Sequence, residues 1–260
     1  MNIYNYCMKL DCILTTVNEN KLYLDFIPIF IQTWNKLYPH VDVKIILIAN
    51  QIPENLIIYQ NNIILFNPID NVSTAFISQY IRLLYQAILN YENGTMISDI
   101  DILPMNGTYY IENIDKFPND KFIYLRDVLM NEYNQIAMCY NVATNKLWGD
   151  IFGIKSLDDI RRTLINKFNS IHYVDGHGSF GWSIDQIDLY NNLMKWNADT
   201  NNLIVLNDNS TGFFRLDRDE FILDDINILN NIKNRIYTDY HCCHPFKEYE
   251  YINNKIYELL

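Results

Sequence analysis

Short runs of branched apolar residues alternate along the first part of the chain with a segment whose apolar residues recur at helical spacing. Such runs, bounded by turn-forming residues, are typical of strands buried on both faces of a sheet. Apolar positions between residues 23 and 37 predict a helix with Pro28 in its first turns. The order strand, helix, strand, strand predicts a right-handed α/β unit with a largely parallel sheet. The apolar runs lie at residues 9–17, 43–49, 62–66 and 95–98.

The rest of the chain continues this alternation of strands and helices. Ser73 or Thr74 is placed to cap a strong helix over residues 75–90, and the strand after it runs straight into Asp99. A Gly- and His-rich segment, 172–181, predicts irregular structure. No linker-like stretch divides the chain, so we expect one domain. Further strands are predicted at residues 121–125, 135–141 and 203–206, and further helices at 146–152, 157–168 and 183–195.

The composition excludes classes of partner rather than naming one. With 20 basic and 31 acidic residues, the net charge is −11, so nucleic-acid phosphates and anionic membranes are repelled. The longest apolar stretch, 45–49, is far too short to span a bilayer. Five cysteines, odd in number and irregularly spaced, are typical of reduced thiols in a cytosol. We therefore expect a cytoplasmic protein that binds no nucleic acid and spans no membrane.

The strongest chemical signal is the sequence Ser98-Asp99-Ile100-Asp101 at the end of an apolar strand. Ligands of open α/β sheets bind beyond the carboxyl ends of the strands, so this is a favourable position for a site. Two carboxylates one residue apart on a turn offer hard oxygen ligands to Mn²⁺ or Mg²⁺ and leave positions open for a diphosphate. The alternative is a loop with two solvated aspartates.

The surroundings of this tripeptide resemble the nucleotide-sugar glycosyltransferases of the GT-A fold. The shared pattern is a helix that bears Arg82, a turn that contains Gly94, and a strand that ends in Asp-x-Asp. Gln79 stands where the mannosyltransferase-like version has Asp, and the spacing from Arg to Gly is about one helical turn longer. The resemblance implies a single GT-A (Rossmann-like) domain over residues 1–260, a nucleotide-sugar donor bound near Ser98 and Asp99, and Mn²⁺ or Mg²⁺ as cofactor.

The tail, residues 239–246, carries a second part of the resemblance. Glycogenin-like enzymes place a His near the C-terminus as a ligand of the same metal, at the start of a His-x-x-Gly-x-x-Lys-Pro-Trp motif. His241 fits the opening position, whereas His244 replaces the Gly and the Lys-Pro-Trp is missing. The resemblance therefore implies Asp99, Asp101 and His241 as metal ligands. Two alternatives are a zinc site made of His241, Cys242, Cys243 and His244, and a surface loop.

A third part of the resemblance is the segment 176–186, where many GT-A enzymes have a flexible glycine-rich loop before an acidic pair. Trp182 is a candidate to stack on a sugar ring. Asp185 and Gln186 are the candidate catalytic residues: Asp185 would accept the acceptor proton in an inverting enzyme or hydrogen-bond the donor sugar in a retaining one. The structural alternative is a helix start, with Ser183 as N-cap and Asp185 as a favourable first-turn charge.

Nucleotide-binding candidates follow from position in such a fold. Thr15, Thr16 and Asn18 stand at the end of the first strand, where the fold holds the base and ribose. Arg82 would neutralise diphosphate charge or form a salt bridge. Further candidates are Asn141, for the acceptor, and one of Arg126, Arg215 and Arg218, for phosphate or sugar.

These signals lead to the hypothesis of a metal-dependent glycosyltransferase that uses a nucleoside-diphosphate sugar, with UDP favoured over GDP, and a glycan or glycoprotein acceptor. The nearest resemblance is to viral and bacterial enzymes that decorate glycans, which would mean the host cytoplasm for a viral protein. One alternative is a nucleotidyltransferase, although residues 15–19 lack its Gly- and Lys/Arg-rich loop. The other is a catalytically silent sugar- or protein-binding module.

Overall fold

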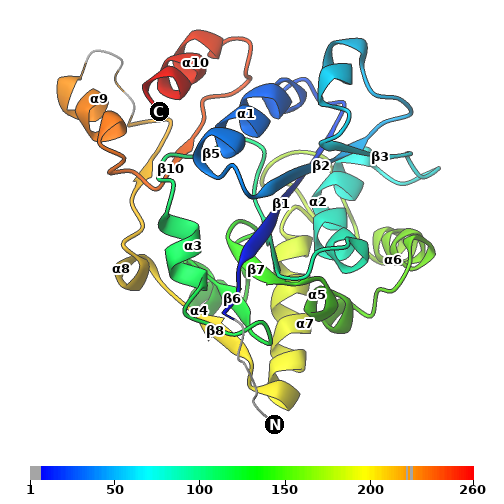
Figure 1. Ribbon diagram of the computed structural model, residues 1–260. Helices are drawn as coiled ribbons and strands as arrows, with labels where there is room; N and C mark the ends of the chain where they lie inside the picture. Colours follow the sequence, from blue (N-terminus) through cyan, green and yellow to red (C-terminus); the bar gives the residue numbers. More distant parts are fainter. Residues whose placement is uncertain (1–6, 221, 223–224) are drawn as a thin grey trace.

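The computed structural model describes residues 7–220, 222 and 225–260. A seven-stranded sheet in the order β3-β2-β1-β4-β7-β6-β8 forms its centre (Figure 1). All of these strands run parallel to one another except β7, which is antiparallel to both of its neighbours. The expected mostly parallel sheet is therefore confirmed. The strands are β1 (Leu10–Asn18), β2 (Asp42–Ile48), β3 (Ile63–Phe66), β4 (Gly94–Ile97), β6 (Phe122–Tyr124), β7 (Asn141–Thr144) and β8 (Leu203–Val205).

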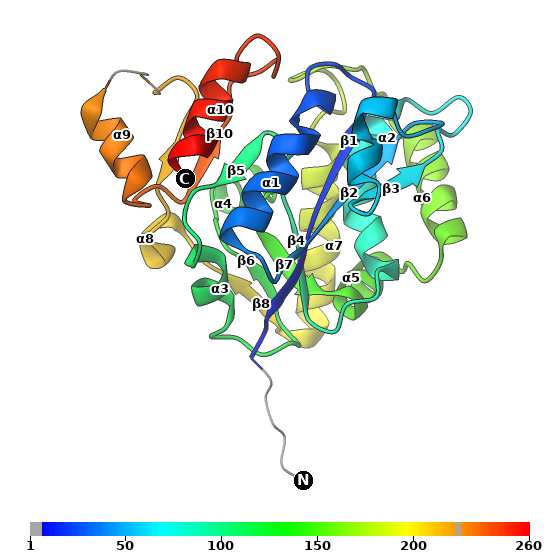
Figure 2. The ribbon, with the colours of Figure 1, turned by 45° about the horizontal axis from the view of Figure 1, so that its top comes forward.

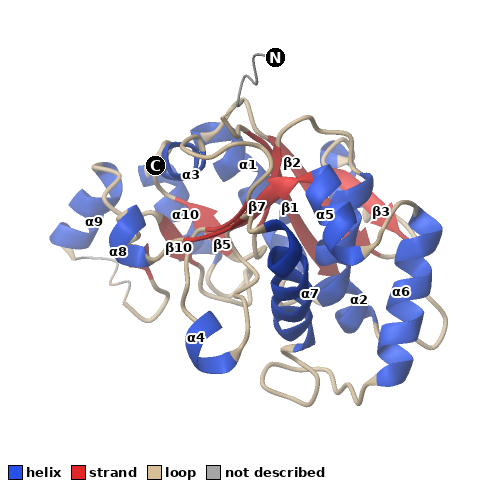
Figure 3. Cartoon of the chain, turned by 90° about the horizontal axis from the view of Figure 1, so that it is seen from below, coloured by secondary structure: helices blue, strands red, loops and turns tan. Residues whose placement is uncertain are grey.

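Helices cover both faces of the sheet (Figure 3). Successive strand side chains point to opposite faces, so Ile13 and Ile45 join one apolar core while Leu14 and Ile46 join the other. The first core packs against α1 (Ile27–Leu37) and α3 (Tyr109–Ile114). The second core packs against α2 (Thr74–Leu84), α5 (Asn145–Phe152), α6 (Leu157–Ser170) and α7 (Ile184–Thr200).

A small second sheet with the order β5-β10-β9 lies beside the large one (Figure 2). β10 pairs antiparallel with β5 and parallel with β9, so the tail of the chain returns to the segment that follows Asp101. The composition of the tail predicted neither this strand nor the C-terminal helix. These elements are β5 (Ile102–Pro104), β9 (Arg215–Leu216), β10 (Asp239–His241), α9 (Ile226–Lys233) and α10 (Glu250–Leu259).

The predicted helix over residues 75–90 is found as two pieces. Ser73 caps it, because its side chain accepts a hydrogen bond from Phe76 N. The α-helix ends at Leu84, and a 3₁₀ turn, η3, continues it. The remaining short elements are η1 (Leu24–Phe26), η2 (Glu54–Tyr59), η3 (Tyr85–Ile88), α4 (Met130–Tyr133) and α8 (Asp208–Thr211).

The predicted strand over residues 135–141 is wrong: residues 135–140 form a loop, and β7 begins only at Asn141. Tyr140 has a φ of 70°, which a strand does not allow. Side chains satisfy the loop backbone in place of a neighbouring strand. The Asn141 amide donates to the carbonyls of Ala137 and Met138, and the Tyr124 hydroxyl accepts from Ala137 N.

Within the described ranges, every helix is too short or too polar to cross a bilayer. The five cysteines all fall in those ranges, and each is a free thiol. Cys7 is exposed, whereas burial raises the pKa of the Cys12 thiol to about 12.

We expect Gly94→Ala to destabilise the fold, because a Cβ at Gly94 would lie 2.8 Å from Val142 Cγ1 and 3.0 Å from the backbone oxygen of Lys9. Overpacking of this kind costs about 1–3 kcal/mol of unfolding free energy, measurable by urea denaturation. Gly107→Ala is the matched control, because its Cβ would approach only the Leu37 oxygen, at 3.2 Å. Equal stability of the two variants would contradict the packing at the β1–β4 junction.

Candidate active site

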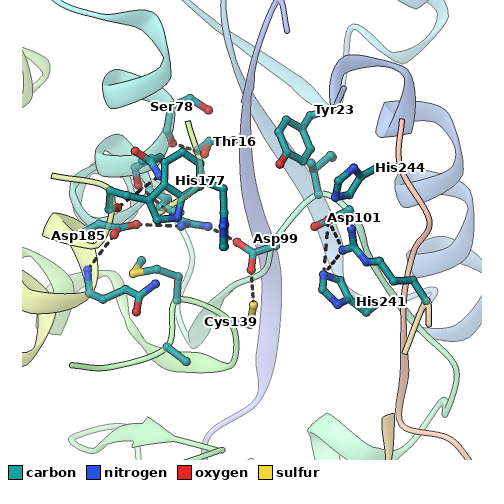
Figure 4. A pocket seen from close by; sticks show the side chains of 18 residues that line it. Thr16, Tyr23, Ser78, Asp99, Asp101, Cys139, His177, Asp185, His241 and His244 are labelled. Atoms are coloured by element: carbon teal, nitrogen blue, oxygen red, sulfur yellow. Dashed lines mark hydrogen bonds and ion pairs between the residues drawn. The ribbon is translucent and has the colours of Figure 1, made fainter. Parts of the chain in front are cut away.

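A cavity of about 650 Å³ opens beyond the carboxyl ends of β1 and β4, where the sequence predicted a site. Its walls come from both sheets, from α2, from the start of α7 and from two loops (Figure 4). The lining residues are Thr16, Tyr23, Ser78, Gln79, Arg82, Asp99, Ile100, Asp101, Ala137, Met138, Cys139, His177, Trp182, Asp185, Gln186, Arg218, His241 and His244.

The Asp-x-Asp segment joins the large sheet to the small one. Ser98 N donates to Leu14 O at 3.0 Å and so extends the pairing of β4 with β1. A turn follows, in which Ile102 N donates to Asp99 O, and Asp101 O then accepts from Cys242 N at 2.8 Å beside β10. Ile100, only 5% exposed, packs into the first core between the two carboxylates. Asp99 thus belongs to the edge of the large sheet and Asp101 to the start of the small one.

Arg82 holds one half of the site. Its guanidinium forms ion pairs with Asp99 and with Asp185, the latter with Nη2 2.9 Å from Oδ2. The second oxygen of Asp99 accepts from the Cys139 thiol. Arg82 therefore forms the salt bridge that was weighed against a direct role in diphosphate binding, and it ties α2 to the end of β4 and the start of α7.

Burial and ion pairing act in opposite directions on the charged groups of this half. Asp185 is 1% exposed, and desolvation raises its pKa although Arg82 and the Gln186 backbone N–H favour the ionised form. Burial alone would lower the pKa of Arg82, but Asp99 and Asp185 raise it instead. Both oxygens of Asp185 are occupied, by Arg82 and by Gln186 N. This arrangement suits a positioning residue better than a general base.

Arg218 holds the other half of the site. Its Nη2 lies 3.0 Å from Asp101 Oδ2 and also contacts His241 Nε2. His241 Nε2 and Asp101 Oδ2 are 3.6 Å apart. Burial would raise the pKa of Asp101, but the neighbouring His241 and Arg218 lower it. Figure 4 shows Asp101, His241, His244 and Tyr23 together on one side, with Asp99, Cys139 and Asp185 on the other.

The glycine-rich loop reaches the cavity through Trp182. Gln79 of α2 anchors the loop, because its side-chain oxygen accepts from the Tyr173 hydroxyl at 2.6 Å. The rings of His177 and Trp182 lie 5.5 Å apart at the cavity wall. A Cβ at Gly181, whose φ is 79°, would lie 2.8 Å from a backbone oxygen, so this turn requires glycine. Ser183 occupies the N-cap position of α7 but forms no side-chain cap.

Of the nucleotide-binding candidates, Thr16 lines the cavity, where its hydroxyl donates to Ser78 O. Thr15, Asn18 and Ser98 lie outside the lining. Thr15 is 1% exposed within β1, and Ser98 is fully buried. Asn18 donates to the Thr74 hydroxyl and ties the end of β1 to α2.

The partners of the three candidate arginines and of Asn141 show which of these residues face the cavity. Arg126 pairs with Asp208, and Arg215 pairs with the buried Asp239, so among the three loop arginines Arg218 is the one that lines the cavity. Asn141 does not face the cavity: it is fully buried and its amide holds the 137–141 loop.

Two of the three expected metal ligands fit a divalent ion. Asp101 and His241 bring a carboxylate oxygen and an imidazole nitrogen together, a donor set that suits Mn²⁺. Asp99 is turned toward Arg82 and Cys139 instead. In the part of the chain that the structure describes, no three His, Cys, Asp or Glu side chains are grouped to hold a metal ion. The alternative zinc site is not formed either. Its four residues make no such group, and Cys242 packs in the first core.

Several cavity residues were not picked out from the sequence. Tyr23 fell in a predicted helix whose apolar spacing explained it as structural, and Met138 and Cys139 fell in the wrongly predicted strand. His177 faces the cavity, although it had no second ligand at useful spacing. His244, which the sequence offered only for the zinc alternative, faces the cavity as well. The signal that would find these residues is proximity to Asp99 and Asp101, which only the folded chain supplies.

We expect Arg82→Gln to destabilise the protein by about 3–5 kcal/mol, because it leaves the buried Asp185 charge without its partner. Arg162→Gln is the control: this arginine also pairs with an aspartate, but its side chain is 67% exposed, and the expected loss is below about 0.5 kcal/mol. Urea unfolding measures both. Similar losses for the two variants would show that the Arg82 network does not hold the site together.

The fold is similar to that of known glycosyltransferases. The galactosyltransferase LgtC, in complex with donor and acceptor sugar analogs, matches with a TM-score of 0.51 and 14% identity over 95% of this chain and 94% of its own. A glutamine-to-glutamate active-site mutant of LgtC matches equally. The glycosyltransferase GlyE of Streptococcus pneumoniae TIGR4 matches with a TM-score of 0.50 and 14% identity over 96% of this chain and 60% of its own.

At the level of sequence, no family model and no curated protein matches this chain. The similarity to LgtC and GlyE therefore shows the fold alone. The expected α/β glycosyltransferase fold is confirmed.

Proposed function

We propose that the protein is a metal-dependent glycosyltransferase. It would transfer a sugar from a nucleoside-diphosphate donor, UDP in preference to GDP, to a hydroxyl group of a glycan or glycoprotein. The observation that carries the proposal is the Asp-x-Asp turn at the cavity, with His241 beside Asp101, in a chain that shares the fold of LgtC.

The charge of the cavity supports the involvement of a metal. Its charged lining consists of three carboxylates, Asp99, Asp101 and Asp185, and two guanidinium groups, Arg82 and Arg218. A diphosphate that entered this site would add negative charge to an existing excess of it. Asp101 and His241 would hold the divalent ion. When bound, that ion supplies the positive charge that stabilises a diphosphate leaving group.

Residues of this chain have distinct roles in the proposal. Thr16 and Tyr23, on the wall beyond β1, would contact the nucleotide. Trp182 would pack against the sugar, as aromatic rings do against apolar faces. Arg82 and Asp185 hold each other and so position the surrounding walls.

Gln186 is the candidate to touch the reacting sugar or acceptor. It lines the cavity, and its side-chain amide has no hydrogen bond to any described residue, so the amide is available to a ligand. A glutamine is also the residue replaced in the LgtC active-site mutant. The free thiols support the reducing cytosol as the site of action.

Thermal unfolding with nucleotides tests the proposal directly. We expect UDP with Mn²⁺ to raise the unfolding temperature, because a ligand that binds only the folded state stabilises it. UDP with EDTA, and GDP with Mn²⁺, should raise it less. The silent binding module predicts no shift with any nucleotide. A nucleotidyltransferase would release pyrophosphate from a nucleoside triphosphate, whereas a glycosyltransferase releases UDP from UDP-sugars.

We expect Asp101→Asn to abolish the joint effect of UDP and Mn²⁺ and to lower the rate of UDP release from UDP-sugars by about a hundredfold or more. The variant keeps the shape of the side chain but removes the charge opposite Arg218 and His241. Asp150→Ala, at an exposed ion pair on α5, is the control for loss of a carboxylate. Full activity of Asp101→Asn in a chain of unchanged circular dichroism would refute the metal role.

A further inference from the structure

Arg218 occupies the place between the two residues proposed to hold the metal. One of its nitrogens, Nη2, contacts both Asp101 Oδ2 and His241 Nε2, the two atoms that would coordinate a divalent ion (Figure 4). A guanidinium is always protonated in proteins, so it carries its charge at every working pH. Metal and guanidinium therefore exclude each other at this position.

Hydrogen bonds and ion pairs of neighbouring residues hold the backbone around Arg218. Arg215, three residues earlier, is fixed in β9 by a bidentate ion pair to the fully buried Asp239, and its Nη2 donates to the Tyr140 hydroxyl. The backbone that leads to Arg218 is thus anchored. Asp217 accepts a hydrogen bond from Arg218 N at 2.7 Å and tightens the turn that directs the side chain toward β10.

The contact also defines the state of His241. A guanidinium has no acceptor, so Arg218 donates and His241 Nε2 must present its lone pair. The ring proton then lies on Nδ1, which is 3.4 Å from Asp217 Oδ1. Nδ1 is buried and forms no hydrogen bond to any described residue, so the Asp217 carboxylate lies near the ring without binding it. Arg218 thus uses the same lone pair that a metal ion would need.

Arg218 is incompletely satisfied where it lies. Its Nε is buried and has no hydrogen-bond partner among residues 7–220, 222 and 225–260. Its side chain is 18% exposed and borders the cavity, so it has a route to a ligand there. A diphosphate offers several charged oxygens in the geometry that a guanidinium prefers.

We propose that Arg218 is an internal counter-cation that occupies the Asp101–His241 pair in the absence of metal and moves to the diphosphate when metal and nucleotide bind. This inference rests on the proposed function. Because each ligand favours the released state of Arg218, metal and nucleotide should each increase the affinity for the other by the same factor. Either ligand alone should bind weakly.

The test measures Mn²⁺ binding to the full chain by calorimetry, without and with UDP. We expect Arg218→Gln to bind Mn²⁺ alone at least about tenfold more tightly than the wild type, a gain of about 1.4 kcal/mol, because the competing charge is gone. The enhancement by UDP should shrink correspondingly. Arg218→Lys, which keeps the charge without the planar fork, should stay close to the wild type for Mn²⁺ alone.

Two controls fix the site and the specificity of the effect. His241→Ala combined with Arg218→Gln should lose the gained Mn²⁺ affinity, which locates the ion at His241. Arg162→Gln removes an exposed arginine that pairs with Asp159 and should leave Mn²⁺ binding unchanged.

The outcomes separate this inference from the proposed function. Equal or weaker Mn²⁺ binding by Arg218→Gln, with UDP and Mn²⁺ still coupled in the wild type, would overturn the role of Arg218 and leave the proposed function standing. If neither protein bound Mn²⁺ even with UDP present, the metal role and the Arg218 inference would both be overturned.

Discussion

The need to balance buried charge organises this structure. Three carboxylates line one cavity, and two arginines from distant parts of the sequence hold them. Arg82 joins α2 to the end of β4 and to α7, and its removal would leave the Asp185 charge buried without a partner, which is strongly destabilising. The relative positions of the large sheet, α2 and α7 depend on this ion-pair network as well as on apolar packing.

The two aspartates of Asp-x-Asp have different partners because the chain between them crosses from one sheet to the other. Ile100 is buried in the first core and fixes that crossing, so the carboxylates point to different partners. Asp99 has Arg82 and Cys139, and it stabilises the wall. Asp101 has Arg218 and His241, two side chains supplied by the small sheet and its margins, and it is the aspartate suited to ligand exchange.

The sequence predicted the parts of the fold that local patterns determine. Branched apolar runs located β1 to β4, since strands buried on both faces are rich in such residues. Residues 135–140 were wrongly predicted as a strand. Their backbone is satisfied by the side chains of Tyr124 and Asn141, and these contacts leave no trace in the periodicity of the sequence. Arg218 could not be separated from Arg126 and Arg215, since in the sequence all three are arginines next to an aspartate or close to one, with nothing to show which faces the site. Only the register of β10 against β5 places His241 beside Asp101 and brings Arg218 to both.

The exchange of partners proposed for Arg218 takes place at the small sheet, where it disturbs the least structure. Its strands are two or three residues long, so few ladder hydrogen bonds hold them, and the buried pair of Arg215 with Asp239 supplies the anchorage. That anchor fixes the backbone close to Arg218, so the proposed exchange would require only the long Arg218 side chain to change rotamer. Moving one side chain disturbs no packed core, whereas moving Arg82 would break a network shared by three elements. In the proposed exchange, a site with more carboxylates than guanidinium groups would therefore adapt to an anionic ligand on the Arg218 side, where a positive charge would be rearranged without unfolding the wall.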